Sequence, residues 1–459
     1  MIIDKQSDFD QRELTFEEID EGYTFRQAIA EAKRCLTCPK PLCRKNCPIE
    51  QEIPQFIEAL AKGNMGEATA IIARRSNLPA VCGRVCPHEK QCEGSCILAK
   101  QGQAIRIGKL ERFVADFDAE VGLTQPSSCS ALSKGKVAVI GSGPAGLTVA
   151  GDLAKLCYDV TVFDAQEEPG GILMYGIPDF RLSKEVVRRE INRIQMLGVE
   201  FRNQVLVGTD CTIDEILDEG FEAIFIGTGT AVPKSLDLPG CDLPGIMQAS
   251  YFLRVLALAN SGNVSRREIP VNPGDKVAII GAGNVAMDAA RTALRVGASE
   301  VTVLYRRDKS TMTALQSEYE HAKAEGVGFS WMSSPLRYIG DHKVEALEIA
   351  LMETKPDGSV VDSGRRENLP VDKVILAIGQ RPAARIISTT SGIEVNEQGY
   401  VITRDKPYGM TTRRGVFAGG DVVHEPATVV LAMKEAKKVA AGMAMYIEAK
   451  KLIEECGGL

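Results

Sequence analysis

Most of the cysteines of this chain lie in two short runs that could bind metal. Of 13 cysteines in 459 residues, eight lie in the first hundred positions. The runs are Cys35-x2-Cys38-x4-Cys43-x3-Cys47 and Cys82-x3-Cys86-x5-Cys92-x3-Cys96. Thiolates are soft ligands that suit iron–sulfur clusters or zinc. Because the chain starts without the apolar core of a secretory signal, a disulfide framework is not expected, and the runs predict a metal or cluster site.

The spacing favours two [4Fe–4S] clusters bound by interleaved runs. Cys47 and Cys86 are each followed by proline, and in bacterial ferredoxins the cysteine before proline serves the other cluster. Residues 49–81, between the runs, have helical periodicity. Zinc is the metal alternative, although structural zinc usually takes pairs of C-x2–4-C knuckles, which the x4 and x5 gaps fit less well. Inert thiols are the remaining alternative.

A second chemical motif is a glycine turn between a predicted strand and a predicted helix. Residues 137–140 are apolar, and Gly141-Ser-Gly143-Pro-Ala-Gly146 follows at once. This G-x-G-x-x-G pattern predicts a turn that cradles a pyrophosphate at a helix N-terminus. The next predicted strand ends in Asp164, near the spacing at which an acid holds a ribose. The alternative is a glycine turn in a sheet that binds nothing.

The same pattern recurs in the second half of the chain. Residues 276–280 form a predicted strand before Gly281-Ala-Gly283-Asn-Val-Ala286, and the next strand ends in Arg306-Arg307. A carboxylate hydrogen-bonds a free ribose hydroxyl, whereas the planar fork of arginine suits a 2′-phosphate. The first unit therefore fits FAD or NAD and the second fits NADP. The alternative for the two arginines is a solvated turn.

Two further stretches carry turn chemistry. Residues 169–178 are rich in glycine and proline, which predicts a loop that can line a ring system rather than a helix or strand. Near the end, Gly420-Asp421 precedes an apolar helix beginning near Thr428. Asp421 could accept a hydrogen bond from a cofactor hydroxyl, and the helix N-terminus could stabilise negative charge on a reduced flavin. The alternative for Asp421 is a plain turn residue.

Composition sets the broad class. The chain is 44% hydrophobic and 25% charged, as in soluble globular proteins. A net charge of −7 argues against non-specific nucleic-acid binding. No apolar run approaches a membrane span, and the first residues are polar, so a cytoplasmic location is expected.

Together these motifs resemble the NADPH-dependent glutamate synthase small (β) subunit family. They are equally similar to the large subunit of NADH-dependent ferredoxin:NADP oxidoreductase and to the N-terminal part of dihydropyrimidine dehydrogenase. The resemblance spans nearly the whole chain, and its most specific pieces are Cys35-Leu-Thr-Cys38, Cys82-Gly-Arg-Val-Cys86-Pro, residues 170–178 and residues 284–293. The chain departs from the family at Met312-Thr313, near the nicotinamide, and at Ser183, near the flavin.

The resemblance implies a set of ligands for each cofactor. One cluster would use Cys35, Cys38, Cys43 and Cys96. The other would use Cys47, Cys86 and Cys92 with Glu111, leaving Cys82 as a neighbour, although spacing alone does not decide between Cys82 and Glu111. FAD would contact Gly141, Ser142, Gly143, Pro144, Ala145, Asp164, Gly171, Leu182, Val205 and Asp421, to which the turn pattern adds Gly420 and Thr428. NADP would contact Gly281, Gly283, Asn284, Val285, Arg306 and Arg307.

The expected fold is α/β, with two Rossmann-like domains that bind FAD and NAD(P) after an α-helical iron–sulfur domain. The helical domain would span residues 1–123, followed by a linker at 124–135. The FAD domain would comprise 136–250 and 371–459, with the NADP(H) domain at 251–370.

The predicted function is an oxidoreductase that moves electrons between NADPH, FAD, two [4Fe–4S] clusters and a partner subunit. Hydride transfer needs no side-chain acid or base, so no catalytic residue is expected. The partner would be a glutamate synthase large subunit or, alternatively, a subunit of an electron-bifurcating transhydrogenase. A thioredoxin-reductase-like activity is disfavoured because no cysteine lies between Cys241 and Cys456. A non-catalytic electron-transfer subunit is the other alternative.

Overall fold

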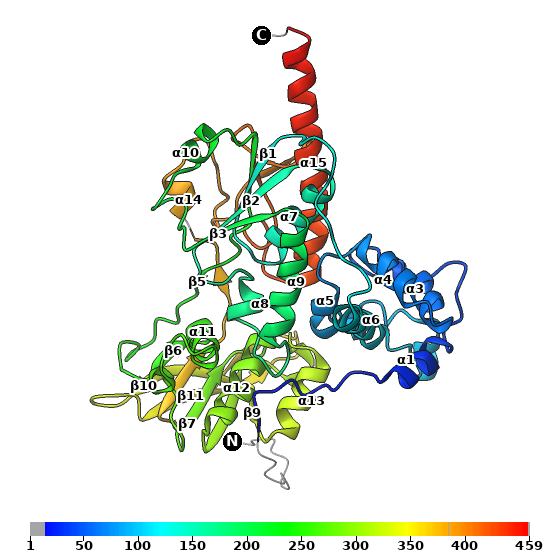
Figure 1. Cartoon of the computed structure of the whole chain (residues 1–459). Coiled ribbons are helices and arrows are strands. Elements are labelled where there is room, and N and C mark those ends of the chain that lie inside the picture. The colour runs from blue at the N-terminus through cyan, green and yellow to red at the C-terminus, as the bar shows by residue number, and fades with distance from the viewer. Residues whose placement is uncertain (1–13, 384, 458–459) are drawn as a thin grey trace. The chain divides into compact units, whose positions relative to one another are not determined.

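The computed structural model describes residues 14–383 and 385–457 (Figure 1). The polar first residues, on which the expected cytoplasmic location partly rests, lie outside this part. The chain divides into two compact units. One comprises residues 18–174, 181–232 and the described residues from 381 to 457, and the other comprises 175–180, 233–380 and the described residues before 18.

The larger unit begins with a helical region that contains both cysteine runs. Its middle helices bury the periodic apolar residues that the sequence indicates, including Phe56, Ile57 and Leu60. A capping box at Thr24 starts the first helix. The elements are α1 (Phe25–Ala32), α2 (Leu42–Lys45), α3 (Ile53–Ala61), α4 (Met65–Ala73), α5 (Pro79–Val85), the 3-10 turns η1 (His88–Lys90) and η2 (Ile97–Gln101), and α6 (Ile107–Val121).

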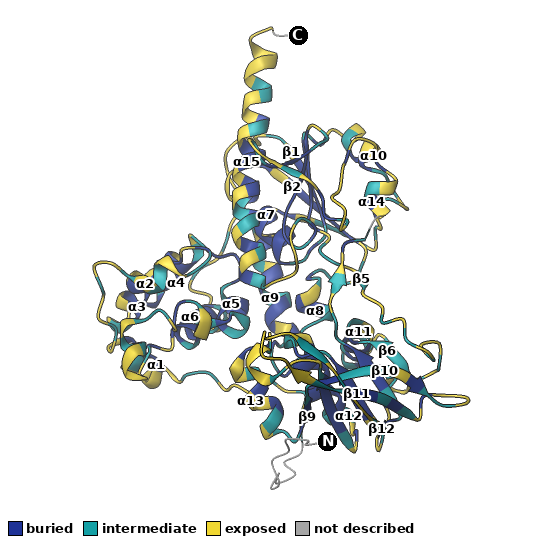
Figure 2. Cartoon of the chain, turned by 180° about the vertical axis from the view of Figure 1, so that it is seen from behind, coloured by how far each residue is buried: buried dark blue, intermediate teal, exposed yellow. Residues whose placement is uncertain are grey.

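A seven-stranded sheet lies at the centre of the rest of this unit. Its strands are β1 (Lys136–Ile140), β2 (Asp159–Asp164), β3 (Glu200–Asn203), β4 (Ala223–Ile226), β15 (Thr403–Asp405), β16 (Tyr408–Thr411) and β17 (Val416–Ala418). The order is β15-β16-β17-β4-β1-β2-β3, and β1 pairs in parallel with both β2 and β4. The strands around β1 and β2 are dark blue in Figure 2, as expected for a parallel sheet covered on both faces.

Among the described residues, six helices belong to this half of the larger unit or to its boundary. They are α7 (Pro144–Lys155), α8 (Ile172–Tyr175), α9 (Lys184–Met196), α10 (Ile213–Asp218), α14 (Arg385–Ser388) and α15 (Val429–Glu455). The prediction that residues 169–178 form only a loop is wrong in part, because α8 is a one-turn helix within them. Its side chains Leu173 and Met174 are buried, so apolar burial outweighs the flanking glycines.

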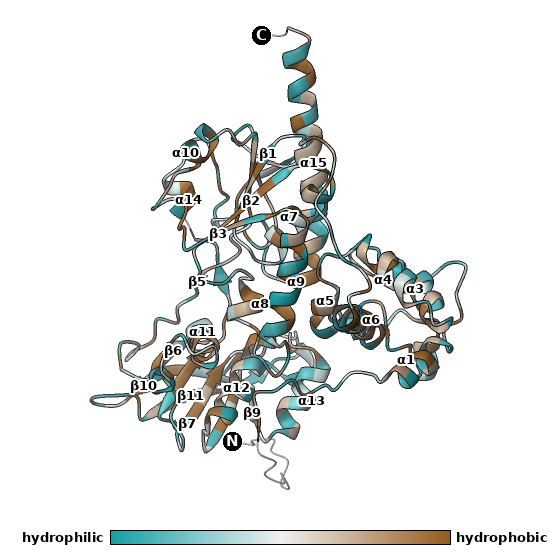
Figure 3. Ribbon diagram, in the orientation of Figure 1, coloured by the Kyte–Doolittle hydropathy of each residue, from teal (hydrophilic) through white to brown (hydrophobic). Residues whose placement is uncertain are grey.

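The smaller unit repeats the strand–turn–helix–strand pattern. A five-stranded sheet has the order β6-β13-β7-β8-β9, and β7 pairs in parallel with β8 and β13. The apolar strand β7 is mostly brown in Figure 3. Its elements are β6 (Ile246–Gln248), α11 (Ala249–Asn260), η3 (Arg266–Glu268), β7 (Lys276–Ile280), α12 (Asn284–Val296), β8 (Glu300–Tyr305), η4 (Lys309–Thr311), α13 (Gln316–Ala324), β9 (Gly328–Trp331) and β13 (Lys373–Leu376). The predicted α/β class, with two Rossmann-like units, is confirmed.

Smaller sheets complete the chain. An antiparallel sheet joins β10 (Ser333–Ile339), β11 (Ala346–Thr354) and β12 (Val360–Pro370), while β5 (Val232–Pro233) pairs with β14 (Gln380–Arg381). Outside the two cysteine runs, Cys129 and Cys157 form a disulfide. Within the described residues, no helix has the length and apolar character needed to cross a membrane.

Candidate cofactor sites

The first glycine turn has the geometry of a phosphate-binding turn. Gly141 has a φ of +96°, and a Cβ there would lie 2.7 Å from the carbonyl oxygen of Gly227, so both its conformation and its surroundings require glycine. A Cβ on Gly146 would overlap the Gly141 carbonyl oxygen, whereas Gly143 has open space beside it. Helix α7 starts directly after the turn, at Pro144. The turn therefore combines tight packing at Gly146 with room for a ligand at Gly143.

Asp164 is tied to this turn by its own hydrogen bonds. The backbone N–H and the hydroxyl of Ser142 both donate to Oδ2 of Asp164, at 2.7 and 2.5 Å, and the N–H of Gln166 donates to Oδ1 at 2.8 Å. The Ser142 hydroxyl in turn accepts from the N–H of Gly170 at 2.8 Å. The sequence pattern gives Asp164 only the role of a ribose acceptor and misses this link, for which the serine within the glycine motif was the available signal.

The remaining residues predicted to contact FAD lie around the same turn. A Cβ on Gly171 would lie 2.9 Å from the Cα of Gly143, so these two glycines approach backbone to backbone. The N–H of Val205 donates to the Asp164 carbonyl at 2.9 Å. Leu182 is fully buried. The fold thus brings Gly171 and Val205 to the turn that the sequence singles out.

The C-terminal glycine turn lies against the first one. A Cβ built on Gly420 would lie 3.0 Å from the Cβ of Ala145. Burial raises the pKa of Asp421 to about 6. The hydroxyl of Thr428 caps α15 by accepting from the N–H of Leu431 at 3.3 Å. Segments more than 250 positions apart in sequence therefore meet at one site.

Glu435 is a member of this site that sequence reasoning missed. Its Oε2 accepts the N–H of Gly420 at 3.2 Å, and its Oε1 lies 2.6 Å from Nε2 of His424. It projects from the second turn of α15, which begins at Val429. Glu435 therefore holds the turn that presents Asp421.

The second glycine turn also precedes a helix, but its hydrogen bonds differ from those of the first turn. Helix α12 begins after Gly283, and Oδ1 of Asn284 accepts the N–H of Leu315 at 2.9 Å. Val285 is 44% exposed. Thr313, one of the departures from the family pattern, lies close to this turn, since a Cβ on Gly283 would be 3.4 Å from its hydroxyl oxygen.

Arg306 and Arg307 follow β8 directly and are both exposed. Among the residues that the structure describes, neither guanidinium has a carboxylate within ion-pair distance. Two unpaired guanidinium groups at the end of this strand are available to a phosphate.

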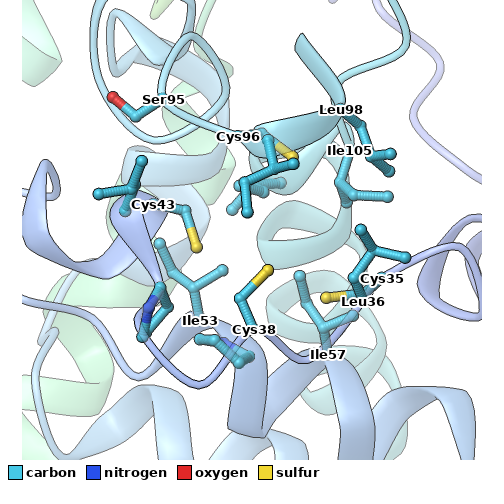
Figure 4. A pocket seen from close by; sticks show the side chains of 15 residues that line it. Cys35, Leu36, Cys38, Cys43, Ile53, Ile57, Ser95, Cys96, Leu98 and Ile105 are labelled. Carbon is cyan, nitrogen blue, oxygen red and sulfur yellow. The ribbon is translucent and has the colours of Figure 1, made fainter. Parts of the chain in front are cut away.

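Four of the predicted cluster ligands line one pocket, called here the outer pocket. These are Cys35, Cys38, Cys43 and Cys96. Figure 4 shows their sulfur atoms around the same space. They come from the segment before α2, from α2 itself and from the residue before η2. Burial raises the pKa of Cys43 to about 11, so binding a metal to these thiols would release protons.

The other cysteines line a second pocket, called here the inner pocket. It contains Cys47, Cys82, Cys86 and Cys92, together with the side chains of Gln51, His88 and Glu111. Burial raises the pKa of Cys47 to about 12. A hydrogen bond with Cys82 raises the pKa of Cys86 well above the usual value, with burial as the second cause.

Glu111 and Cys82, the two candidates for the fourth ligand, both line the inner pocket. Glu111 is 7% exposed, its pKa is raised to about 7 by burial, and its Oε1 accepts from Nε2 of Gln51 at 3.4 Å. Cys82 points toward α15, where its sulfur lies 3.7 Å from the sulfur of Met433. Nε2 of His88 is buried with no hydrogen-bond partner in the described chain.

These donor sets fit the clusters predicted from the sequence. Four thiols converge in the outer pocket, and the inner pocket adds a buried carboxylate and an orphaned imidazole nitrogen to its thiols. Within residues 14–383 and 385–457, no three cysteine, histidine or acidic side chains are arranged around a single metal ion.

Comparison with known proteins identifies the family. Residues 12–123 match the model described as dihydropyrimidine dehydrogenase domain II, 4Fe-4S cluster, and residues 135–436 match pyridine nucleotide-disulphide oxidoreductase. The glutamate synthase [NADPH] small chain of Halomonas elongata is 36% identical over 95% of this chain and 94% of its own length. The chain belongs to this family. It is an oxidoreductase of the iron–sulfur flavoprotein type, as the resemblance predicts.

One further relative and one solved structure are also similar to this oxidoreductase. The NADP(+)-dependent formate dehydrogenase subunit beta of Moorella thermoacetica is 36% identical over 88% of this chain and 60% of its own length. The structure of Mycobacterium tuberculosis FprA in complex with NADPH aligns with a TM-score of 0.57 at 21% identity, covering 70% of this chain and 86% of that one. This last similarity concerns the fold.

Proposed function

We propose that the oxidoreductase takes electron pairs from NADPH onto FAD and passes single electrons through two [4Fe–4S] clusters to a partner protein. One observation carries the proposal. Ile53 and Ile107 line both cysteine pockets, and Val430, in the first turn of α15, lines the inner one. Since Thr428, a predicted flavin contact, lies two residues before Val430, the order flavin, inner pocket, outer pocket is supported.

The proposed ligands follow from the two pockets. Cys35, Cys38, Cys43 and Cys96 hold the outer cluster. Cys47, Cys86 and Cys92 hold the inner cluster, with Glu111 or Cys82 as the fourth ligand. When bound, FAD accepts hydride and the clusters carry single electrons.

The chain's own groups would position the flavin and tune its charge. The turn of Gly141 and Gly143 cradles the pyrophosphate, and Asp421 accepts from a hydroxyl of the cofactor. The N-terminus of the 27-residue helix α15 stabilises negative charge near Thr428. Glu435 keeps the Gly420 turn in place through the hydrogen bond to its N–H.

The second glycine turn and its arginines would select NADPH. Each charge-assisted hydrogen bond contributes about 1.5–3 kcal/mol, so we predict that Arg306→Ala with Arg307→Ala raises KM for NADPH about 100-fold. KM for NADH would change little, because NADH lacks the 2′-phosphate. Steady-state reduction of ferricyanide measures both, with Arg365→Ala as the control, since Arg365 is exposed in the same unit. An unchanged KM for NADPH would refute the role of the arginines.

The partner would be a separate subunit. The Halomonas relative is named a small chain and the Moorella relative a subunit beta, so similar chains serve different assemblies. A glutamate synthase large subunit is the first candidate, and a subunit of an electron-bifurcating transhydrogenase is the second. Copurification from the native cell identifies it.

Anaerobic addition of NADPH to the purified holoprotein tests the proposed function. The flavin absorbance is expected to bleach at once. If the flavin stays oxidised with NADPH but bleaches with dithionite, the chain binds its cofactors without reacting with NADPH, and the proposal fails.

A further inference from the structure

The outer pocket has an apolar rim that is exposed to solvent. Leu36, Leu42 and Ile97 are 56%, 46% and 46% exposed, and all three line this pocket with its cysteines. Figure 4 shows Leu36 next to the cysteines. Exposed apolar side chains gathered at a functional pocket are typical of a protein-binding surface.

The segments that carry this rim are strongly basic, although the whole chain has a net charge of −7. Residues 32–49 contain five lysines and arginines and no acid, and residues 94–110 contain three and no acid. Three of these cations are paired within the chain, since Arg34 pairs with Glu31, Arg106 with Glu93 and Lys109 with Asp20.

Five of the basic side chains have no such pairing. They are Lys33, Lys40, Arg44, Lys45 and Lys100. Within the described chain, none of these five side chains has a carboxylate within ion-pair distance. Each lies within two residues of a residue that lines the outer pocket. The pocket is thus bordered by unpaired positive charge that is available to a partner.

The inner pocket offers no comparable surface. Val430 lines it, and Met433 of the same helix contacts Cys82. Two of its cysteines, Cys82 and Cys92, are buried and the other two, Cys47 and Cys86, are partly exposed, whereas every cysteine of the outer pocket is partly exposed. Among the described residues, no large exposed apolar side chain lines the inner pocket. The outer pocket is therefore the better suited of the two to contact with a second protein.

We propose that this basic, apolar-rimmed face docks an acidic protein that carries single electrons, with its own redox centre placed against the outer pocket. This inference rests on the proposed function and names the chemistry of the partner. Leu36, Leu42 and Ile97 would exclude water at the contact, while the five free cations would steer and orient the partner's acidic face. In the direction that forms NADPH, two reduced carriers, NADP⁺ and one proton would give two oxidised carriers and NADPH.

The test uses charge reversal on the holoprotein. Lys40→Glu with Lys45→Glu changes the docking face, and Lys355→Glu with Arg365→Glu is the matched control on exposed residues of the other unit. The probe is a photoreduced acidic ferredoxin with two [4Fe–4S] clusters, and NADPH formation from NADP⁺ is followed at several salt concentrations. Basic cytochrome c, reduced with NADPH, serves as the oppositely charged carrier.

For the docking face, we expect the ferredoxin reaction to slow about tenfold in K40E/K45E and to lose most of its salt dependence. The control pair should stay within twofold of wild type, and K40E/K45E should reduce cytochrome c faster. NADPH should bleach the flavin equally in all three proteins.

Equal ferredoxin rates in both charge-reversed proteins would overturn the docking face, as would no reaction of wild type with ferredoxin at any salt concentration. Loss of flavin bleaching by NADPH in wild type is a different result, because it removes the proposed function itself.

Discussion

The two cysteine pockets use the same ligand chemistry in different surroundings. The outer pocket has partly exposed thiols and an exposed apolar rim, while the inner pocket contains buried Cys82 and Cys92 with buried Glu111. Solvent exposure, hydrogen bonds and net charge set the potential of an iron–sulfur cluster. From this difference we infer that the outer pocket exchanges electrons with another protein and that the inner pocket connects it with the flavin.

The largest expected effect comes from removing one thiol from either pocket. Cys38→Ser and Cys92→Ser should each lose about half of the bound iron. Each should also slow electron transfer to a protein carrier at least about 100-fold, because the loss of either cluster interrupts transfer from the flavin to the carrier. Flavin bleaching by NADPH should persist in both, and Cys241→Ser, which changes an exposed cysteine outside the pockets, should resemble wild type. If the C38S protein still reduces the carrier at the full rate, the outer pocket does not take part in electron transfer to the carrier.

A buried acid beside the inner pocket should make stability depend on pH. Glu190 of α9 is 2% exposed, and its Oε1 accepts the N–H of Ala80 at 3.0 Å, at the start of the helix that carries Cys82. Burial raises its pKa from 4.5 to about 7. The neutral acid is favoured in the folded chain, so its contribution is fully present below pH 4.5 and is lost as the pH rises through about 7.

We therefore expect the free energy of unfolding of wild type to fall by about 2 kcal/mol more than that of Glu190→Gln between pH 5 and pH 8. Urea unfolding at the two pH values measures the difference. Glu185→Gln, on an exposed position of the same helix, should behave like wild type. If the unfolding free energy of E190Q depends on pH as strongly as that of wild type, the burial of Glu190 does not cause the pH dependence.

A smaller effect should come from the glycine that makes room for His88. A Cβ on Gly108 would overlap the imidazole of His88, which lines the inner pocket. Gly108→Ala should cost at least about 1 kcal/mol through overpacking and should weaken iron retention in the inner pocket only. Gly66→Ala is the matched control, because α4 leaves open space beside Gly66. Equal iron content and stability in the two variants would contradict the tight fit around His88.

The parts of the fold that follow from local pattern were predictable. The strand, glycine turn and helix around Gly141 and around Gly281 each depend on a short stretch of sequence, and the cysteine spacing indicates two interleaved sites. What could not be predicted depends on contacts between distant segments. Glu190 meets Ala80 across 110 positions, and Glu435 reaches back to Gly420 only because α15 starts where it does.

The fourth ligand of the inner pocket could not be predicted from local sequence either. Cys82 and Glu111 are separated along the chain, and spacing gives no reason to bring both to one pocket. The basic rim of the outer pocket is visible as an acid-free stretch in the sequence. Whether it forms a docking surface depends on which of its cations have no ion-pair partner in the folded chain.

Iron and acid-labile sulfide analysis of the anaerobically purified holoprotein tests the central claim of two occupied pockets most directly. The account predicts about eight iron and eight sulfide atoms per chain. About four of each would leave one pocket without a cluster, and zinc without sulfide would contradict the iron–sulfur assignment altogether.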